Sequence, residues 1–159
     1  MKSGLLMPSY NFTNRNIVSI HMTVESHNRE LINKMGSGVS KAVDRTANIT
    51  RRAMQMLIIG GARTGRIYFR RGGNIHQASA PGEPPKKDDG QLANQIINRM
   101  VDPLNAEIDT MDNEYAAALE FGRNDGTIKP RPFFQKTVLK NQSTLETEVQ
   151  KAIREEGIV

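Results

Sequence analysis

Cysteine and tryptophan are absent from this chain of 159 residues, and histidine occurs only three times. Without cysteine, disulfide bonds, thiolate metal sites and cysteine nucleophiles are excluded. His21, His27 and His76 follow no spacing that is typical of a histidine metal site. No apolar run approaches the roughly 18 residues that a membrane-spanning helix needs, and the start Met1–Pro8 is too short for a signal peptide. We therefore expect neither a metal nor a membrane partner.

The sequence also lacks the short motifs of common enzymes. It contains no phosphate loop ending in Gly-Lys-Ser/Thr, no His-Glu-x-x-His zinc motif and no Gly-x-Ser-x-Gly nucleophile turn. We therefore predict a binding or assembly protein that uses no cofactor and is not an enzyme. The length fits one domain, which we place at residues 17–159. Residues 1–16 are polar apart from a few side chains and are predicted to be a flexible N-terminal arm.

Charges of opposite sign are separated along the chain, although the net charge is only +5. Residues 33–87 contain eleven basic and two acidic residues, whereas residues 88–127 contain nine acidic and two basic ones. Clustered Lys and Arg can neutralise phosphates, so the basic block is compatible with a nucleic-acid surface. It is equally compatible with a subunit whose positive side attracts the negative side of its own copies. Ordinary solvated charge is the third interpretation.

The strongest periodic pattern predicts a long amphipathic helix of about thirty residues. Apolar residues recur at intervals of three and four over Ile32–Leu57, and Gly60 supplies a C-terminal stop. Gly36 and Gly38 each cost about 1 kcal/mol relative to alanine in a helix, so we expect a bend or a close contact there. Residues 54–59 are apolar nearly all round, which predicts burial on more than one side.

Alternating polarity predicts strands at residues 17–25, 97–101 and 106–111, the last two joined by a tight turn. Short helices are expected at residues 91–96 and 115–121. A final amphipathic helix is expected from residue 134 to residue 153, with a polar interruption at residues 143–144. The predicted fold class is α/β of the α+β type. In it, a small and mainly antiparallel sheet packs against one long N-terminal helix and a C-terminal helix.

A long proline-rich loop is predicted at residues 71–90, after a short strand at residues 66–70. Three of the seven prolines fall within residues 81–85, and proline favours an extended backbone that donates no hydrogen bond. Loops longer than about 12–15 residues in compact domains are usually functional or disordered. We therefore expect this loop to contact other subunits rather than its own core. His76 lies in the loop and is either a contact residue or an ordinary polar residue.

Five segments of the sequence, taken in order, resemble one known family. They are Gly65–Tyr68, His76–Pro85, Asp89–Ile96, Tyr115–Gly122 and Pro130–Phe134. This order is similar to that of the tail-component family of long-tailed phages, which is related to minor tail protein Z and includes tail-completion and head–tail joining proteins. The resemblance covers most of residues 61–139.

Two positions depart from the family pattern. Arg123 follows the Glu-Phe-Gly element, where threonine is usual, and Phe133-Phe134 replaces a single aromatic residue followed by an aliphatic one. Neither departure disturbs the fold that the resemblance implies.

The resemblance implies a structural protein of the phage neck. It would form a ring of its own copies, six by preference or alternatively twelve, and join the head or portal side to the tail tube. Its partners would be those copies, the adjacent neck and tail-tube proteins, and genomic DNA passing through the channel without sequence-specific binding. It would be found in the virion and, during assembly, in the host cytoplasm.

Candidate interface residues follow from the charge pattern, the arm and the loop. They are Tyr10, Phe12, Arg66, Arg70, Arg71, His76, Pro81, Glu83, Pro84, Pro85 and Arg131. Glu107 and Asp109 share one face of a predicted strand and are candidates to line the channel, where they would repel DNA phosphates. An ordinary solvated strand face is the alternative for these two acids.

The main alternative function is nucleic-acid binding through the basic block at residues 51–71. No helix-turn-helix, zinc-finger or ribbon pattern accompanies this block, and only Tyr68 and Phe69 are interleaved with its arginines. A nuclease using the carboxylates of Asp88 and Asp89 is a weaker alternative, because metal nucleases need carboxylates that converge from defined strands. The neck subunit is the function that the sequence favours.

Overall fold

The structure, a computed structural model, describes residues 20–23, 29–69, 71–111 and 113–155. For residues 20–23 and 29–35 it describes the backbone only. The predicted arm with Tyr10 and Phe12 lies outside the described residues, as does Arg70.

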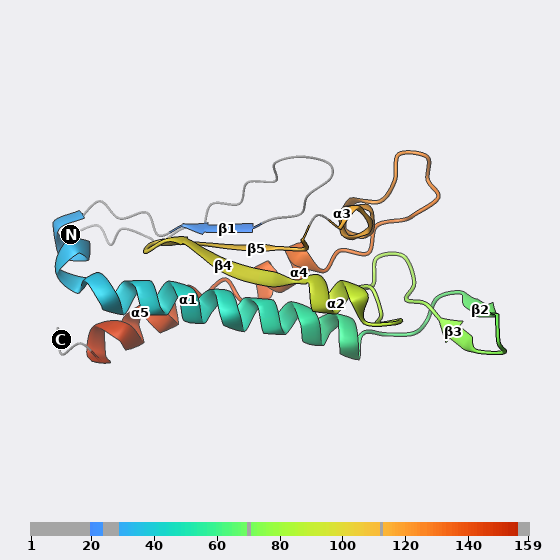
Figure 1. The fold of residues 1–159 in the computed structure, drawn as a ribbon, viewed down its shortest axis with the longest axis horizontal. Coiled ribbons are helices and arrows are strands. Elements are labelled where there is room, and N and C mark those ends of the chain that lie inside the picture. Colours follow the sequence, from blue (N-terminus) through green and yellow to red (C-terminus); the bar gives the residue numbers. More distant parts are fainter. Residues whose placement is uncertain (1–19, 24–28, 70, 112, 156–159) are drawn as a thin grey trace.

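Within these ranges the chain forms helices and strands in a mixed order, so the predicted α+β class is confirmed (Figure 1). In chain order the elements are β1 (Ile20–Thr23), α1 (Arg29–Gly60), β2 (Ile67–Phe69), β3 (Ile75–Gln77), α2 (Gln91–Gln95), β4 (Ile97–Asp102), β5 (Asn105–Asp109), α3 (Glu114–Phe121), α4 (Phe134–Lys140) and α5 (Thr144–Glu155).

The main sheet has three antiparallel strands in the order β1-β5-β4. Ala106 and Ile108 of β5 are buried, whereas Glu107 between them lies on the opposite face. The turn between β4 and β5 is held by Asp102, whose carboxylate accepts a hydrogen bond from the Leu104 amide at 2.8 Å. This bond lowers the pKa of Asp102 below its ordinary value. The strand pair and the turn therefore form as the alternating pattern predicts.

Helix α1 is the longest element and packs against the sheet, α4 and α5 (Figure 1). Its backbone departs from helical geometry at Gly36, where the expected bend is found. The expectation that its last turns are buried on more than one side is wrong. Met54 and Ile58 are buried, but Met56 is 64% exposed and Ile59 is 42% exposed, because the sheet and α2 cover one side of the helix only.

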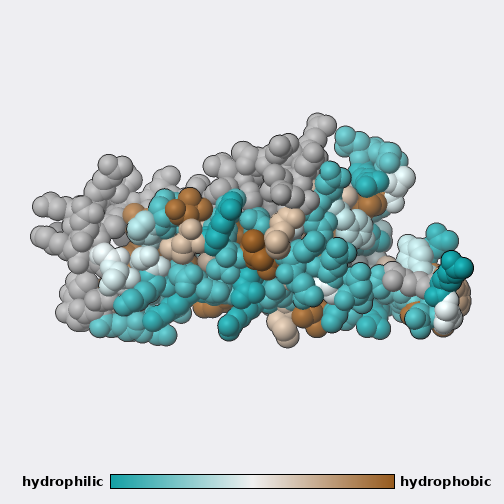
Figure 2. Space-filling view, in the orientation of Figure 1, coloured by the Kyte–Doolittle hydropathy of each residue, from teal (hydrophilic) through white to brown (hydrophobic). Residues whose placement is uncertain are grey.

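The predicted C-terminal helix is two helices, α4 and α5, separated by residues 141–143. The amide nitrogen and the side chain of Asn141 both bond to the carbonyl of Thr137, which ends α4. Helix α5 then runs back along α1 (Figure 1) and buries Leu145, Val149 and Ala152. The space-filling view shows a mostly hydrophilic face with small separate apolar patches (Figure 2).

Substitution of Val39 by aspartate tests the position of α1. Val39 is 3% exposed within the core, so Val39→Asp places an unpaired charge there and should cost about 3–5 kcal/mol of unfolding free energy. Met56→Asp, on the exposed side of the same helix, is the matched control and should cost less than about 1 kcal/mol. Urea unfolding of both variants measures the difference. Equal urea midpoints for the two variants would contradict the packing of Val39 in the core.

Candidate functional site

The carboxylate of Glu120, at the end of α3, is buried and bonded to the start of α4. One oxygen, Oε2, accepts hydrogen bonds from the amides of Phe133 at 2.8 Å and Phe134 at 3.0 Å, and Oε1 accepts one from Gln135 at 3.0 Å. The first amides of a helix have no partners within the helix, and negative charge is favourable at that end. Glu120, which is 4% exposed, therefore fixes α4 against α3.

The loop from Gly122 to Pro130 returns the chain to this contact. Gly122 has φ 80°, and a side chain there would come within 3.0 Å of both the Ile128 carbonyl and the Pro130 ring, so glycine is required. Behind it the Arg131 amide donates to the Leu119 carbonyl at 2.6 Å. The motif segments Tyr115–Gly122 and Pro130–Phe134 are therefore bonded directly to one another.

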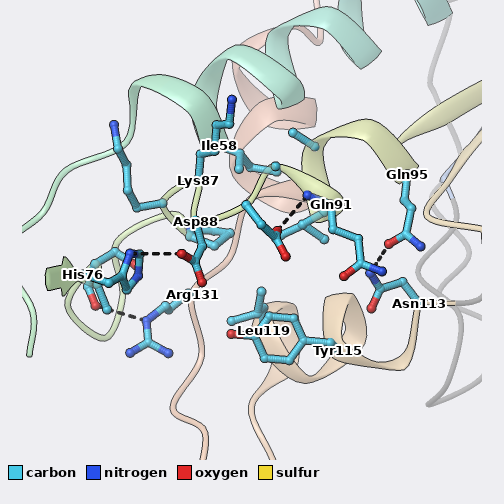
Figure 3. A pocket seen from close by; sticks show the side chains of 18 of the residues that line it. Ile58, His76, Lys87, Asp88, Gln91, Gln95, Asn113, Tyr115, Leu119 and Arg131 are labelled. Carbon is cyan, nitrogen blue, oxygen red and sulfur yellow. Dashed lines mark hydrogen bonds and ion pairs between the residues drawn. The ribbon is translucent and has the colours of Figure 1, made fainter. Parts of the chain in front are cut away.

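The side chain of Arg131 extends this unit to the proline-rich segment. Its Nε donates to the carbonyl of Ser79 at 3.2 Å (Figure 3), and the Gly82 amide donates to the Pro130 carbonyl at 2.8 Å. Ser79 is itself buried and lies so close to Gly65 that a Cβ at residue 65 would come within 2.3 Å of the Ser79 carbonyl oxygen. Four of the five motif segments thus meet at one place in the fold.

The proline-rich segment packs on its own domain, contrary to the expectation for this loop. Pro85 is buried, Pro84 is half-buried, and the Lys87 amide donates to the Ile58 carbonyl at 2.8 Å. Only Pro81 and its neighbour Gly82 are exposed at the turn. Two backbone amides of this segment, those of Gly82 and Lys87, donate to the carbonyls of Pro130 and of Ile58 in α1. The proline content of a sequence does not show such bonds, so composition alone predicted a loop that leaves the core.

Glu83 holds the turn of this segment. Its carboxylate accepts hydrogen bonds from the Thr64 hydroxyl and from the Ala80 amide, which lower the pKa of Glu83 below its ordinary value of 4.5. Because the pKa is lower in the folded state, ionised Glu83 stabilises the fold above its ordinary pKa. That contribution is lost as the pH falls through the folded value.

A groove of about 920 Å³ lies between the β2–β3 hairpin, residues 85–91 and α3 (Figure 3). On one wall His76 Nδ1 lies 3.3 Å from Asp88 Oδ1. On the other, Asn113 caps α3 and donates to the Gln95 side chain of α2. Charges of both signs line the groove, which suits a peptide or protein surface better than a single ion.

The β2–β3 hairpin projects beyond the end of α1 (Figure 1), and the sequence predicts only the first of its two strands. The sequence indicated β2 but not its partner β3, which pairs Tyr68 with His76 and Phe69 with Ile75. Gly72 and Gly73 form the turn with φ of 95° and 81°. This Gly-Gly pair between two short apolar runs is the signal that predicts a hairpin.

The two candidate channel acids share one face of β5, as expected, and both have partners. Arg99 of β4 lies 2.6 Å from the carboxylate of Glu107, and this bond raises the pKa of Arg99. The Glu107 side chain is only 12% exposed, and Asp109 accepts a hydrogen bond from the Met111 amide. Their position facing a channel stays a prediction.

The other candidate interface residues are spread over two regions. Arg66 and Arg71 are exposed on the hairpin, and the Arg66 guanidinium lies 5.4 Å from the centre of the Tyr68 ring. His76, Pro85 and Arg131 line the groove. The structure therefore places these five candidates on the hairpin and along the groove beside it, whereas Pro81, Glu83 and Pro84 lie in the proline-rich segment outside the groove lining.

Among the described residues, no group of three or more His, Asp or Glu side chains is placed to hold a metal ion. In the same part of the chain, no helix is long and apolar enough to cross a membrane. Comparisons of this chain with protein-family models, with curated proteins and with solved structures found no match. The likeness to the phage tail-component family therefore stays a prediction from the motif segments.

Replacing Glu120 with glutamine tests the contact between α3 and α4. Glutamine has one acceptor oxygen and an amide group that faces a donor, so Glu120→Gln should cost about 2–4 kcal/mol of unfolding free energy. Glu146→Gln, in the exposed first turn of α5, is the matched control and should cost less than about 0.5 kcal/mol. Chemical denaturation of the two variants provides the measurement. A Glu120→Gln protein as stable as the control would refute the anchoring of α4 by this carboxylate.

Removal of the Thr64 hydroxyl tests the anchor of the proline-rich segment. Thr64→Val should raise the pKa of Glu83 toward 4.5, because it removes the hydrogen bond that lowers this pKa most. Carboxyl NMR titration measures this pKa directly. In Thr127→Val, the control, the pKa of Asp125 should rise instead, because that carboxylate accepts a bond from the Thr127 hydroxyl. An unchanged Glu83 pKa in Thr64→Val would contradict the contact.

Proposed function

We propose that this chain is a structural subunit of the neck of a long-tailed phage, where its copies form a ring between the head and the tail tube. The observation that carries the proposal is the ordered set of motif segments. Four of them are joined by the hydrogen bonds of Gly65, Arg131 and Glu120, so the resemblance involves one connected scaffold rather than scattered matches.

Surface charge supports assembly from identical copies. The exposed arginines Arg63, Arg66 and Arg71 lie just after α1 and on the hairpin. The exposed acids of residues 88–127 lie beside the groove, at the β4–β5 turn, on α3 and in the loop after it, and they are Asp88, Asp89, Asp102, Glu114 and Asp125. A subunit with two different complementary surfaces associates head to tail, and such contacts close into rings when the rotation between copies allows it. Unlike charges on separate elements therefore fit the proposed ring.

The same arginines leave nucleic-acid binding as the competing function. Within the basic block, Arg51 is half-buried and donates to Gln55, so it is engaged on α1 itself. Arg52, Arg63 and Arg66 are exposed. A nucleic-acid-binding regulator would use them on duplex DNA, whereas a neck subunit uses them between copies, and a genetic experiment separates these roles.

Deletion of the gene from the phage that carries it tests the proposal. A neck subunit is needed only to join finished parts, so the deletion should yield DNA-filled heads and complete tails that stay separate in electron micrographs. In wild-type virions, antibody-coupled gold should mark the head–tail junction. Supplying the protein from a plasmid is the control and should restore joined particles.

Two results would contradict the neck assignment. Joined, infectious particles from the deletion strain would show that the neck does not need this protein. A deletion that changes phage transcription or DNA replication, with joined particles lacking the protein, would favour the nucleic-acid-binding function instead.

A further inference from the structure

The β2–β3 hairpin has one apolar face that is exposed. Side chains alternate along a strand, so Ile67, Phe69 and Ile75 share one face, while Tyr68 and His76 share the other. His76 faces the groove and meets Asp88 (Figure 3). On the first of these faces Phe69, which also lines the groove, is 81% exposed, Ile75 66% and Ile67 50%. We call these three residues the hairpin face.

Exposure of this kind is costly unless another molecule covers it. A two-stranded hairpin is marginally stable in water by itself, and contiguous exposed apolar side chains on a projecting element mark interaction sites. Phe69 and Ile75 are directly paired across the hairpin, so their side chains form one patch. The hairpin face therefore needs an apolar partner surface.

The charge around the hairpin face indicates the charge that a partner surface should carry. Residues 61–82 contain four arginines, at positions 63, 66, 70 and 71, and no acidic residue. Arg71, in the turn of the hairpin, is exposed next to this face, whereas the Arg66 guanidinium lies over the Tyr68 ring on the opposite face. A partner that combines exposed apolar side chains with negative charge would be attracted, and a basic one would be repelled.

The chain carries such a surface itself, at the start of α3. Met111 is 57% exposed and Tyr115 is 54% exposed, and both line the groove together with the exposed Glu114. Of the acidic residues nearby, Glu120 is buried and Glu107 is paired with Arg99, so the negative charge of this surface is that of the exposed Glu114. We call Met111, Glu114 and Tyr115 the α3 surface. Its exposure shows that the hairpin of the same copy leaves it open.

We propose that the hairpin face of one copy docks on the α3 surface of a second copy. This inference rests on the proposed function for its partner, since it names the contact through which copies of the neck subunit associate. Phe69 and Ile75 cover Met111 and Tyr115, and Arg71 pairs with Glu114. The two surfaces differ, so each copy uses both, and the contact propagates head to tail.

Two variants remove the two halves of this contact separately. The hairpin variant carries Phe69→Ser and Ile75→Ser, and the α3 variant carries Glu114→Lys and Tyr115→Ser. Each should raise the dissociation constant for self-association by at least about tenfold in sedimentation velocity. Leu139→Ser, at a residue 60% exposed on α4, is the matched control and should associate as the wild type does. Circular dichroism checks that all of them are folded.

Mixing the two variants provides the sharper test. A one-to-one mixture retains one working contact, between the intact hairpin of the α3 variant and the intact α3 surface of the hairpin variant. It should therefore form heterodimers that grow no further. A contact between two hairpins would give no heterodimer, and that result would overturn the proposal.

A charge exchange tests the pairing without changing the apolar residues. Arg71→Glu should weaken association, and combining it with Glu114→Arg in the same chain should restore at least part of it. Full association by the hairpin variant, or a wild type that stays monomeric at all concentrations, would overturn the proposal. The proposal would also be overturned if the hairpin variant lost binding to duplex DNA or to anionic vesicles while its self-association stayed unchanged.

Failure of this contact and failure of the neck function give different results. If virions contain the protein at the head–tail junction but the hairpin variant assembles normally, the contact is wrong and the neck function stands. If the variants behave as expected but the gene deletion leaves joined particles, the contact is right and the neck function is wrong.

Discussion

The buried carboxylate of Glu120 is the interaction on which the arrangement around the candidate site depends. It is the acceptor for three successive amides at the start of α4, and burying it without these donors would leave an uncompensated charge in the core. Holding α4 against α3 also fixes Arg131, which is bonded to both Leu119 and Ser79. The proline-rich segment and the base of the hairpin are then positioned by the same network.

This constraint explains how a firmly built domain presents a projecting hairpin. Gly65 pairs with Ala78, and Ser79 is held by Arg131, so the base of β2–β3 is bonded to the core. Beyond that base, the residues of the hairpin face are largely exposed, and Phe69 is the most exposed large apolar residue among those described. The rigidity of the base and the exposure of the face together suit a preorganised contact between copies.

Periodicity predicted α1 and the β4–β5 pair, because α1 and β5 bury residues at regular intervals. Helix α3 was predicted from its alanine-rich run, and it buries five consecutive residues rather than one face. Periodicity did not predict the contacts that depend on individual hydrogen bonds. The three amides that bond to Glu120 produce no periodic pattern in the sequence. The proline-rich segment was expected to lie away from the core, because its composition does not show which carbonyls accept hydrogen bonds from its amides. The pairing of β3 was predictable from Gly72 and Gly73, whose turn signal lies between two short apolar runs.

Electron cryo-microscopy of the neck, in the virion or in the assembled protein, tests the central claim most directly. We expect a closed ring of identical subunits in which the density of each β2–β3 hairpin lies on the Met111–Tyr115 surface of the next copy. A neck that lacks this fold would contradict the proposed function. A ring of this fold whose hairpins lie in solvent, or on one another, would contradict the proposed contact between its copies.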